Sequence, residues 1–559
     1  MRQVFLRQRR AARGSLKVKT IAVVGCGPMS LYVLKALAAS AEPLRIEVFE
    51  AGDEPGAGMP YGAAQNADFM LCNAYSQEIP PLTTTLVDWL SRRTPRDLGA
   101  WALTRSDISA RAFYPRVLIG EYLRWELDAL CARARRAGHR VRVRSRCAVE
   151  DVVPQEDGVL VCARGDGGAF RLEADDAIVA TGHRWPTAPA IDGVPLRSPW
   201  PARTLADLPA GRIGVLGSSL SAIDILVALG HAHGTFEERG GAVAWRPHPG
   251  REGLKVTMVS RSGVMPEADF HYPFPYEPLL HLTGAAVDAE TARGGEGLLD
   301  RVFALLLREL EAQAPGWLDG LGEGARTLEG FASAAFARRR ASDAGAAMRR
   351  DLLEARRTMD RQETVAHRYA LLRAHEVFDR ALRHLTDADH ARFARHLLPV
   401  FADCYAAVPH LSVERVLALF EAGAAELVPC DEARFEAAGG GVRVTVGDRT
   451  LEFEAMIDAR GQAPAPVADL PFRGLVAALE DGRPVAAPFR LPLRGAGMGR
   501  VYCLAMPQLL ERHPFSQGLA NVAALAEQAV EDLLAPEAGG FGTPVAANDP
   551  LAPARRPAA

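Results

Sequence analysis

Residues 21–30 read IAVVGCGPMS, and residues 31–38 continue with apolar positions spaced as on one face of a helix. This order of short apolar strand, glycine turn and helix is typical of a dinucleotide-binding unit, with Ser30 in place of the third glycine. Gly25 allows the tight turn, and Gly27 lets backbone amides approach a pyrophosphate at the positive end of the helix. The pattern predicts a dinucleotide site at this turn.

A second predicted strand strengthens this interpretation. Residues 44–50 read LRIEVFE and end in Glu50, which lies 23 residues after Gly27. A carboxylate at this spacing is placed to accept a hydrogen bond from a ribose hydroxyl. The first unit therefore contains strand, glycine turn, helix, strand and acid in the expected order.

A second unit begins at residues 212–224, which read RIGVLGSSLSAID. Serines replace the usual glycines after Gly217, and small hydroxyl side chains still permit a close phosphate approach and add hydrogen-bond donors. The next predicted strand, 256–260, is followed by Arg261, which suits a 2′-phosphate and favours NADPH over NADH. The alternative is a surface arginine after a strand, because residues 231–253 look like a long loop that blurs the spacing.

An internal duplication links the two units. Residues 158–172 predict a β-hairpin, and the buried strand 176–182 follows and ends in Ala-Thr-Gly. The same order recurs in residues 441–454 and 455–461, which end in Ala-Arg-Gly. Each unit is thus predicted to be closed by a hairpin and a short strand.

The overall composition is that of an ordinary globular chain. Of 559 residues, 48% are hydrophobic and 24% charged, and 65 Lys and Arg against 68 Asp and Glu give a formal charge of -3. A net charge this close to zero produces no overall electrostatic field that would attract nucleic acid or anionic lipid. We therefore expect neither a nucleic-acid nor a membrane partner. No apolar run is long enough to span a bilayer, and a cytoplasmic protein is expected.

Eight cysteines occur without any C-x-x-C spacing or a Cys/His cluster typical of zinc. A disulfide framework and a metal site are therefore not expected. The redox-active cysteine pair that flavin disulfide reductases need is also missing from the sequence.

Taken together, these motifs resemble those of flavoproteins with two dinucleotide-binding domains, allied to the ornithine and lysine N-hydroxylases and the flavin-containing monooxygenases. The resemblance rests on residues 24–30, Glu50, the segment GAGMPYG at 56–62, Ala-Thr-Gly at 180–182 and Gly-Ser-Ser at 217–219. It implies an α/β fold of two Rossmann-like domains, for FAD and NADPH, with a large helical insertion. The linker motif F-x-G-x-x-x-H-x-x-x-[FY] of two monooxygenase subgroups has no match between Gly182 and Gly214.

The resemblance also implies positions for the cofactors. Residues 69–74 would run under the flavin ring, and residues 499–505 would return as the last strand of the FAD domain. The loop 513–519 would direct a helix N-terminus at the ring, where it stabilises negative charge on reduced flavin. Catalytic residues are unknown, and the candidates beside the ring are Asn73, Ser516 and Gln517. Cofactor binding is expected at Gly25, Gly27, Pro28, Met29, Ser30, Glu50, Tyr61, Asn73, Thr181, Gly182, Gly217, Ser218, Ser219, Ser221, Ser260, Arg261, Gln517, Gly518 and Leu519.

A helical segment interrupts the second unit. Residues 297–312, 341–382 and 411–424 place apolar residues at three- and four-residue spacing, with arginines and glutamates between them. This insertion is either a substrate lid or a packing or dimer surface. Its arginines, among them Arg368, are expected on the solvent-exposed faces of the helices.

The expected domain organisation has seven parts. They are a basic N-terminal tail at 1–18, the FAD-binding domain at 19–200, the NADPH-binding domain at 201–265, the helical insertion at 266–428, the return of the NADPH domain at 429–470, the closing part of the FAD domain at 471–535 and a disordered tail at 536–559.

The resemblance implies an oxidoreductase, an NADPH-dependent flavoprotein monooxygenase that uses molecular oxygen. It would oxygenate a nucleophilic nitrogen of a small amine or amino acid through a flavin hydroperoxide, as in N-hydroxylation. Two alternatives remain: an NAD(P)H dehydrogenase or reductase that passes electrons to another acceptor, and a non-catalytic FAD-binding redox protein. A homo-oligomer is possible in each case.

Overall fold

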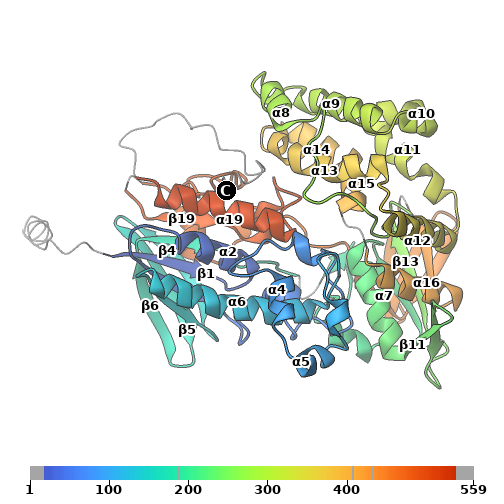
Figure 1. Cartoon of the computed structure of the whole chain (residues 1–559), viewed down its shortest axis with the longest axis horizontal. Helices are drawn as coiled ribbons and strands as arrows, with labels where there is room; N and C mark the ends of the chain where they lie inside the picture. The colour runs from blue at the N-terminus through green and yellow to red at the C-terminus, as the bar shows by residue number, and fades with distance from the viewer. Residues whose placement is uncertain (1–17, 186–188, 406–407, 431, 496, 537–559) are drawn as a thin grey trace, which may run out of the picture.

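The computed structural model describes residues 18–185, 189–405, 408–430, 432–495 and 497–536. The expected basic tail at 1–18 and the expected disordered tail at 536–559 lie outside the described residues, apart from Val18 and Pro536. The two nucleotide units lie at opposite ends of the long axis of the molecule, and a layer of helices lies over the second unit and the junction (Figure 1).

The first unit contains five parallel strands in the order β19-β7-β1-β2-β3. β19 comes from the end of the chain and places Cys503 beside Val179 of β7. The first unit is therefore closed by the last strand, as the resemblance implied. The strands are β1 Lys19–Val24, β2 Leu44–Phe49, β3 Arg140–Arg144, β7 Asp176–Val179 and β19 Arg500–Cys503.

Long helices cover this sheet. α2 (Pro28–Leu37) lies beside α19 (Leu519–Leu534), and α6 (Arg116–Arg136) contacts α2 (Figure 1). The inward faces of α2 and α19 are apolar, and their buried leucines, valines and alanines belong to the same core as the strands. Shorter helices of this unit are α3 Gly58–Tyr61, α4 Leu86–Ser91, α5 Pro95–Gly99, α17 Arg473–Ala478 and α18 Met506–Leu509.

The second unit has a four-stranded parallel sheet in the order β14-β13-β10-β18. α7 (Leu220–His233) and α16 (His410–Glu421) pack together in its core. β14 starts at residue 425, four residues before the expected return of the second unit. The strands are β10 Arg212–Leu216, β13 Lys255–Ser260, β14 Ala425–Pro429 and β18 Ala455–Asp458.

Each unit carries an antiparallel three-stranded sheet at the expected hairpin. One is formed by β4 (Ala148–Gln155), β5 (Gly158–Gly165) and β6 (Gly168–Ala174), and the other by β15 (Arg434–Ala438), β16 (Gly441–Val446) and β17 (Arg449–Phe453). The duplication therefore includes one more strand per unit than the hairpins that the sequence indicated.

The prediction of a long loop at residues 231–253 is wrong. The chain there forms the hairpin of β11 (Gly234–Arg239) and β12 (Ala242–Pro247). Gly240 and Gly241 have positive φ values of 58° and 80°. Positive φ at both residues of a two-residue loop is typical of the tight turns that connect the strands of a hairpin. A short pair, β8 (Ala190–Ile191) and β9 (Val194–Pro195), lies in the linker between the units.

The helices of the expected insertion belong to two different cores. α12 (Ala344–Arg361) ends at Gln362, which has φ of 54°, so the expected continuous stretch 341–382 is broken into two helices. Met348 and Leu352 of α12 pack in the core of the second unit, whereas Phe378 of α13 packs in a separate helical core. The other helices are α8 Gly284–Thr291, α9 Leu298–Gln313, α10 Trp317–Leu321, α11 Leu328–Arg340, α13 Ala366–Leu382, α14 Asp387–His396 and α15 Leu398–Tyr405.

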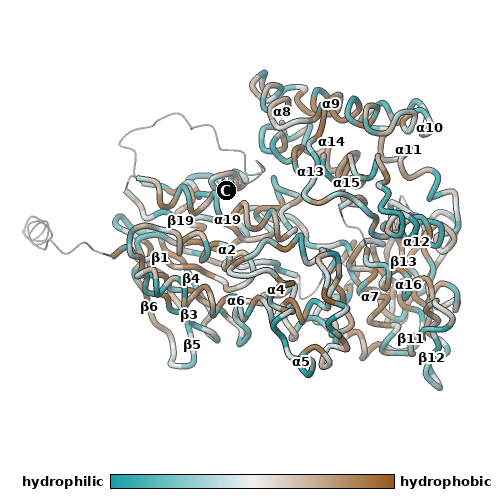
Figure 2. The backbone as a smooth tube through the Cα atoms, in the orientation of Figure 1, coloured by the Kyte–Doolittle hydropathy of each residue, from teal (hydrophilic) through white to brown (hydrophobic). Residues whose placement is uncertain are grey.

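The hydrophobic residues follow this division. Figure 2 shows hydrophobic stretches along the strands and a mixture of hydrophobic and hydrophilic positions along helices such as α9. Amphipathic helices of this kind bury one face against a neighbouring layer. Among the described residues, no helix is both long and apolar enough to cross a membrane.

Candidate functional site

The two glycine turns have the same local geometry. The N–H of Gly25 donates to Phe49 O at 2.9 Å, and the N–H of Gly217 donates to Val259 O at 2.9 Å. Both glycines have positive φ, 102° and 120°. A Cβ at Gly25 would lie 2.3 Å from Ala180 O, and one at Gly217 would lie 2.9 Å from Ala459 O. Each turn therefore requires glycine for the same two reasons, positive φ and close backbone approach.

Three helix N-termini at the expected cofactor positions carry no side-chain cap. α2 begins after Gly27, α7 after Ser219 and α19 after Gly518, and no side chain at these three positions accepts a hydrogen bond from the first turn of the helix. By contrast, Thr85 caps α4 and Thr283 caps α8. The first backbone N–H groups of the three helices remain available to an anionic ligand group.

Glu50 lies at the end of β2, beside the first glycine turn. Its Oε2 accepts from Cys26 N at 3.1 Å, and its Oε1 accepts from Gly52 N at 2.8 Å. The carboxylate is only partly buried. The structure thus brings the expected acid next to the turn that would hold the pyrophosphate.

Three of the expected serines, Ser30, Ser218 and Ser260, have their hydroxyls engaged inside the protein. Ser30 Oγ donates to Gly25 O at 2.7 Å, which stabilises the turn itself. Ser218 Oγ lies 2.7 Å from Val264 O and 2.8 Å from Ser260 Oγ. Ser219 is exposed at the start of α7, and Ser221 is half-buried. Ser219 is therefore the exposed hydroxyl among the expected serines, and it lies at the N-terminus of α7.

Arg261 is exposed directly after β13. Its carbonyl oxygen accepts from Arg340 Nη2 at 3.4 Å, which brings a second guanidinium from α11 close to the same edge. Sequence spacing gave no sign of Arg340, because it belongs to a helix of the insertion. Two arginines beside the end of β13 suit a doubly charged phosphate.

Residues 69–74 cross the junction between the two units. On one side, Phe69 stacks on His231 of α7 at 4.0 Å, and Phe69 O accepts from Arg415 Nη1 at 3.0 Å. On the other side, Cys72 N donates to Tyr114 O at 2.9 Å. The segment expected under the flavin ring, with the half-buried Asn73, therefore spans the region between the two sites.

Other expected FAD residues surround the first turn. Tyr61 ends α3 beside Cys72, and burial raises the pKa of its phenol well above the usual value. Thr181 is exposed, and the carbonyl oxygen of Gly182 accepts from Met506 N at 3.2 Å. Pro28 and Met29 occupy the first turn of α2.

The loop before α19 is fixed by the helical layer. The ring of Phe515 lies 5.2 Å from His375 of α13 and 5.8 Å from Phe401 of α15. Ser516 is buried and lies near Met506, whereas Gln517 and Gly518 are exposed. Leu519 begins α19. The insertion thus packs directly against the loop that the resemblance places at the flavin.

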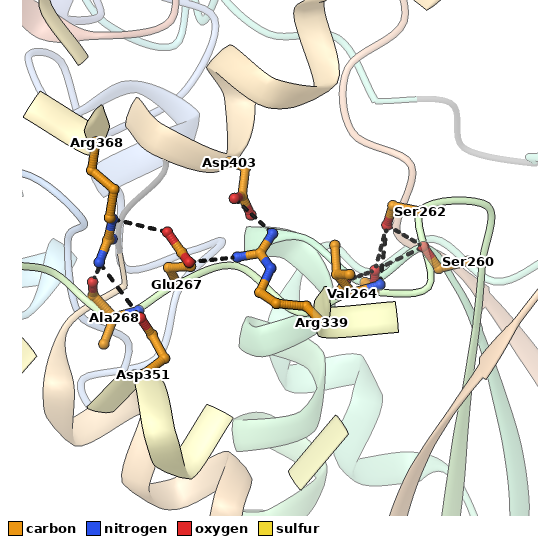
Figure 3. A network of polar contacts seen from close by, with 10 residues as sticks. Ser260, Ser262, Val264, Glu267, Ala268, Arg339, Asp351, Arg368 and Asp403 are labelled. Carbon is orange, nitrogen blue, oxygen red and sulfur yellow. Dashed lines mark hydrogen bonds and ion pairs between the residues drawn. The ribbon is translucent and has the colours of Figure 1, made fainter. Parts of the chain in front are cut away.

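A buried ionic network ties the segment after β13 to the helices (Figure 3). Arg368 Nε lies 2.8 Å from Glu267 Oε2, and Arg339 Nη1 lies 3.1 Å from Glu267 Oε1. Arg339 also pairs with Asp403 at 2.7 Å, and Arg368 with Asp351 at 3.5 Å. Arg368 was expected on a solvent-exposed helix face, but it is buried, with only 3% of its surface exposed. The end of the second nucleotide site is therefore connected to α11, α12, α13 and α15.

This network contains three carboxyl groups and two guanidinium groups. Burial and the negative Glu267 raise the pKa of Asp351 to about 7, and burial raises the pKa of Asp403 to about 6. The two arginines lower the pKa of Glu267. The carboxyl groups of Asp351 and Asp403 therefore hold a proton more tightly than isolated aspartates do.

The eight cysteines form no disulfide with one another, and seven of them are buried. Burial raises the pKa values of Cys26, Cys72, Cys404 and Cys503. Among the described residues, no group of three or more His, Cys, Asp or Glu residues is arranged to hold a metal ion.

The comparisons with known proteins agree with the two-part architecture. Residues 22–184 match the family described as FAD-NAD(P)-binding, and residues 283–405 match the YdhS-like middle domain. The uncharacterized protein YdhS of Escherichia coli (strain K12) is 36% identical over 525 residues, which cover 93% of this chain and 98% of that protein. The chain belongs to the YdhS family. It is an α/β oxidoreductase-type flavoprotein with FAD and NAD(P) as its cofactors.

Solved structures of similar architecture include enzymes with different reactions. An ornithine N-hydroxylase from Kutzneria sp. 744 is 17% identical, with coverage of 92% of this chain and 99% of that chain and a TM-score of 0.46. The bacillithiol disulfide reductase Bdr from Bacillus cereus is 12% identical, with coverage of 92% and 99% and a TM-score of 0.42.

Proposed function

We propose that this protein is an FAD-dependent, NADPH-using monooxygenase that oxygenates a nucleophilic nitrogen of a small amine or amino acid. The observation that carries the proposal is the combination of two matching glycine turns, at Gly25 and Gly217, with a sequence that contains no C-x-x-C pair and no disulfide among its eight cysteines. Two nucleotide sites allow a pyridine nucleotide to reduce the flavin, and the chain offers no cysteine pair to take the electrons further.

The residues have separate binding roles in this proposal. The first turn, Glu50 and the N-terminus of α2 hold the adenosine diphosphate half of FAD. Gly217, Ser219 and Arg261 hold NADPH at the N-terminus of α7. When bound, FAD supplies the electron-accepting and oxygen-activating chemistry. Residues 69–74 and the loop before α19 position the ring between the two sites and exclude water.

The reaction balances without any other reductant. A primary amine, molecular oxygen, NADPH and one proton yield a hydroxylamine, water and NADP⁺. One oxygen atom forms the new N–O bond, and the other leaves as water after it takes up the two electrons of the hydride. The attacking nitrogen must be unprotonated, so the site also has to remove a proton from an ammonium group.

The proposal is tested by measuring three quantities together in the FAD-loaded protein. We expect a screened amine to increase NADPH oxidation and oxygen consumption and to gain one oxygen atom by mass spectrometry. Rapid reduction of ferricyanide or a quinone by NADPH, with no amine that gains oxygen, would instead indicate the reductase. No flavin reduction by NADPH or NADH would contradict both enzymatic functions.

A further inference from the structure

A small cavity lies at the edge of the first sheet, away from the first glycine turn. It has a volume of about 390 Å³ and is lined by residues of β2, of β3 with the residue before it, and of the end of α6. β3 is the edge strand of the sheet, and α6 contacts it (Figure 2). Arg45 in the lining pairs with Thr20 near the start of β1, whereas Gly25 follows the end of that strand. The cavity is therefore near the amino ends of the strands, and the FAD turn is at their carboxyl ends.

The lining of this cavity, which we call the β3 cavity, is strongly basic. Arg45 pairs with Arg140, and Glu47 pairs with Arg142, across the parallel strands β2 and β3. Residues paired in this way, two positions apart along each strand, place their side chains on the same face of the sheet. The titratable lining residues are Arg45, Glu47, Arg135, His139, Arg140 and Arg142. Four arginines against one glutamate leave the lining with an excess of three positive charges.

The one carboxylate of the lining is already saturated by two arginines. Glu47 Oε1 accepts from Arg45 Nη2 at 2.7 Å and from Arg45 Nε at 2.9 Å. Glu47 Oε2 accepts from Arg144 Nε at 2.9 Å. Arg135 Nη2 donates to Val141 O at 3.0 Å, which is a neutral acceptor. Within the part of the chain that the structure describes, no ion pair is formed by Arg135, Arg140 or Arg142. Three guanidinium groups at one concave surface create a local positive potential that attracts an anion.

His139 adds a buried hydrogen-bond donor without an acceptor. This side chain lines the β3 cavity, and the residue is only 3% exposed. The N–H of Leu44 donates to His139 Nδ1 at 3.1 Å, so Nδ1 carries no proton and the ring carries its proton on Nε2. Nε2 points away from Leu44, and among the described residues it has no hydrogen-bond partner. A buried N–H without an acceptor is unfavourable. An oxygen atom bound in the cavity would supply that acceptor.

We propose that the β3 cavity binds a phosphate group, either as the free anion or as the head group of a small phosphomonoester. The guanidinium groups of Arg135, Arg140 and Arg142 supply charge-assisted hydrogen bonds to the phosphate oxygens, and His139 Nε2 donates to one more. A cation is excluded by the charge of the lining, and an uncharged ligand would leave the three guanidinium groups unbalanced. The site is separate from the FAD turn, and the inference does not rest on the proposed function.

Binding is measured by isothermal titration calorimetry on the FAD-loaded protein at neutral pH and constant ionic strength. The probes are inorganic phosphate and glycerol 3-phosphate, with acetate as a singly charged anion and glycerol as the neutral match of the ester. We expect saturable binding of phosphate or its ester, at least about tenfold tighter than binding of acetate. Tighter binding of glycerol 3-phosphate than of phosphate would identify a phosphomonoester, and the reverse order would identify the free anion. No saturable binding of either phosphate probe, or equal binding of acetate, would overturn the inference.

Two variants locate the site. Arg142→Gln removes one exposed guanidinium group of the lining and should weaken phosphate binding at least about fivefold. His139→Asn keeps an acceptor for the N–H of Leu44 but removes the Nε2 donor, and it should also weaken phosphate binding. The matched control is Arg136→Gln, because Arg136 is exposed on the last turn of α6 and does not line the cavity.

A further control separates this site from the expected NADPH site. Arg261→Gln should leave the affinity for phosphate unchanged, because Arg261 follows β13 of the second unit. Unchanged phosphate affinity in Arg142→Gln, or an equal loss of affinity in Arg136→Gln, would overturn the inference. Loss of phosphate binding in Arg261→Gln alone would place the anion at the second nucleotide unit and would likewise overturn it.

Discussion

The guanidinium group of Arg116 lies 2.8 Å from the carboxylate of Asp224, with side chains only 15% and 13% exposed. Arg116 begins α6 of the first unit, and Asp224 lies on α7 of the second, so this ion pair joins the two nucleotide units. The N–H of Arg116 also donates to Met70 O at 2.9 Å. The pair therefore fixes residues 69–74 at the same junction.

Removing one member of this pair should destabilise the protein. Arg116→Met leaves a buried Asp224 unpaired, and Asp224→Leu leaves a buried Arg116 unpaired, and we expect each to cost about 3 kcal/mol in the free energy of unfolding. The loss of unfolding free energy in the double variant should be smaller than the sum of the losses in the two single variants, because no charge is then left unpaired. Urea unfolding followed by tryptophan fluorescence measures the cycle. Additive single costs would contradict the coupling.

Alanine substitutions at the two glycine turns should affect the two cofactors differently and so distinguish their sites. Gly25→Ala should abolish FAD retention, because its Cβ meets Ala180 O and φ is positive. Gly217→Ala should retain FAD but lose at least tenfold in the rate of flavin reduction by NADPH. Absorbance at the flavin bands gives both readouts. Gly99→Ala is the control, because a Cβ there meets nothing within 4 Å and φ is not positive. Loss of FAD in Gly217→Ala alone would contradict the assignment.

Arg261 should determine the preference for the phosphorylated nucleotide. In Arg261→Gln, we expect KM for NADPH to rise about tenfold with little change for NADH, since one charge-assisted contact to the 2′-phosphate is lost. Arg212→Gln is the control, because Arg212 is exposed at the opposite end of β10. Equal changes of KM for NADPH and NADH would contradict the role of Arg261.

The buried network should make stability depend on pH through Asp351. Its pKa is raised from 3.8 to about 7 by burial and Glu267, so the folded state binds the proton more tightly than the unfolded state. This contribution is fully present below about pH 4 and is lost as the pH rises through 7. Asp351→Asn cannot lose a proton at this position, so its stability does not fall in this way as the pH rises. The Tm of the variant minus the Tm of the native protein should therefore be larger at pH 8 than at pH 5. A Tm difference that is constant or falls with pH would contradict this assignment.

The nucleotide units could be predicted because their signals are local in sequence. A strand, a glycine turn and a helix occupy about 20 consecutive residues at both Gly25 and Gly217. Gly240-Gly241 carried an equally local hairpin signal that was missed among the glycines and arginines of residues 231–253. The predicted positions of the cofactors, of Ser219 and of Arg261 depend on such local patterns.

The helical layer and its polar contacts could not be predicted in this way. Arg368 has the sequence context of a wet helix face, and only its distance of 2.8 Å from Glu267, about 100 residues away, identifies it as buried. Glu78 and Tyr272 are separated even further in sequence, and only the tertiary packing of the aromatic residues around Tyr75 brings the Tyr272 hydroxyl within 2.5 Å of the Glu78 carboxylate. Period and spacing along one chain carry no information about such contacts.

The most direct measurement follows amine-dependent oxygenation in the FAD-loaded protein. After anaerobic reduction with one equivalent of NADPH, oxygen is admitted with and without an amine, and the flavin spectrum and the mass of the amine are recorded. The account predicts faster flavin reduction by NADPH than by NADH, and an amine that gains one oxygen atom for each NADPH oxidised. Complete return of the electrons to oxygen as hydrogen peroxide, with every tested amine and amino acid unchanged in mass, would contradict it.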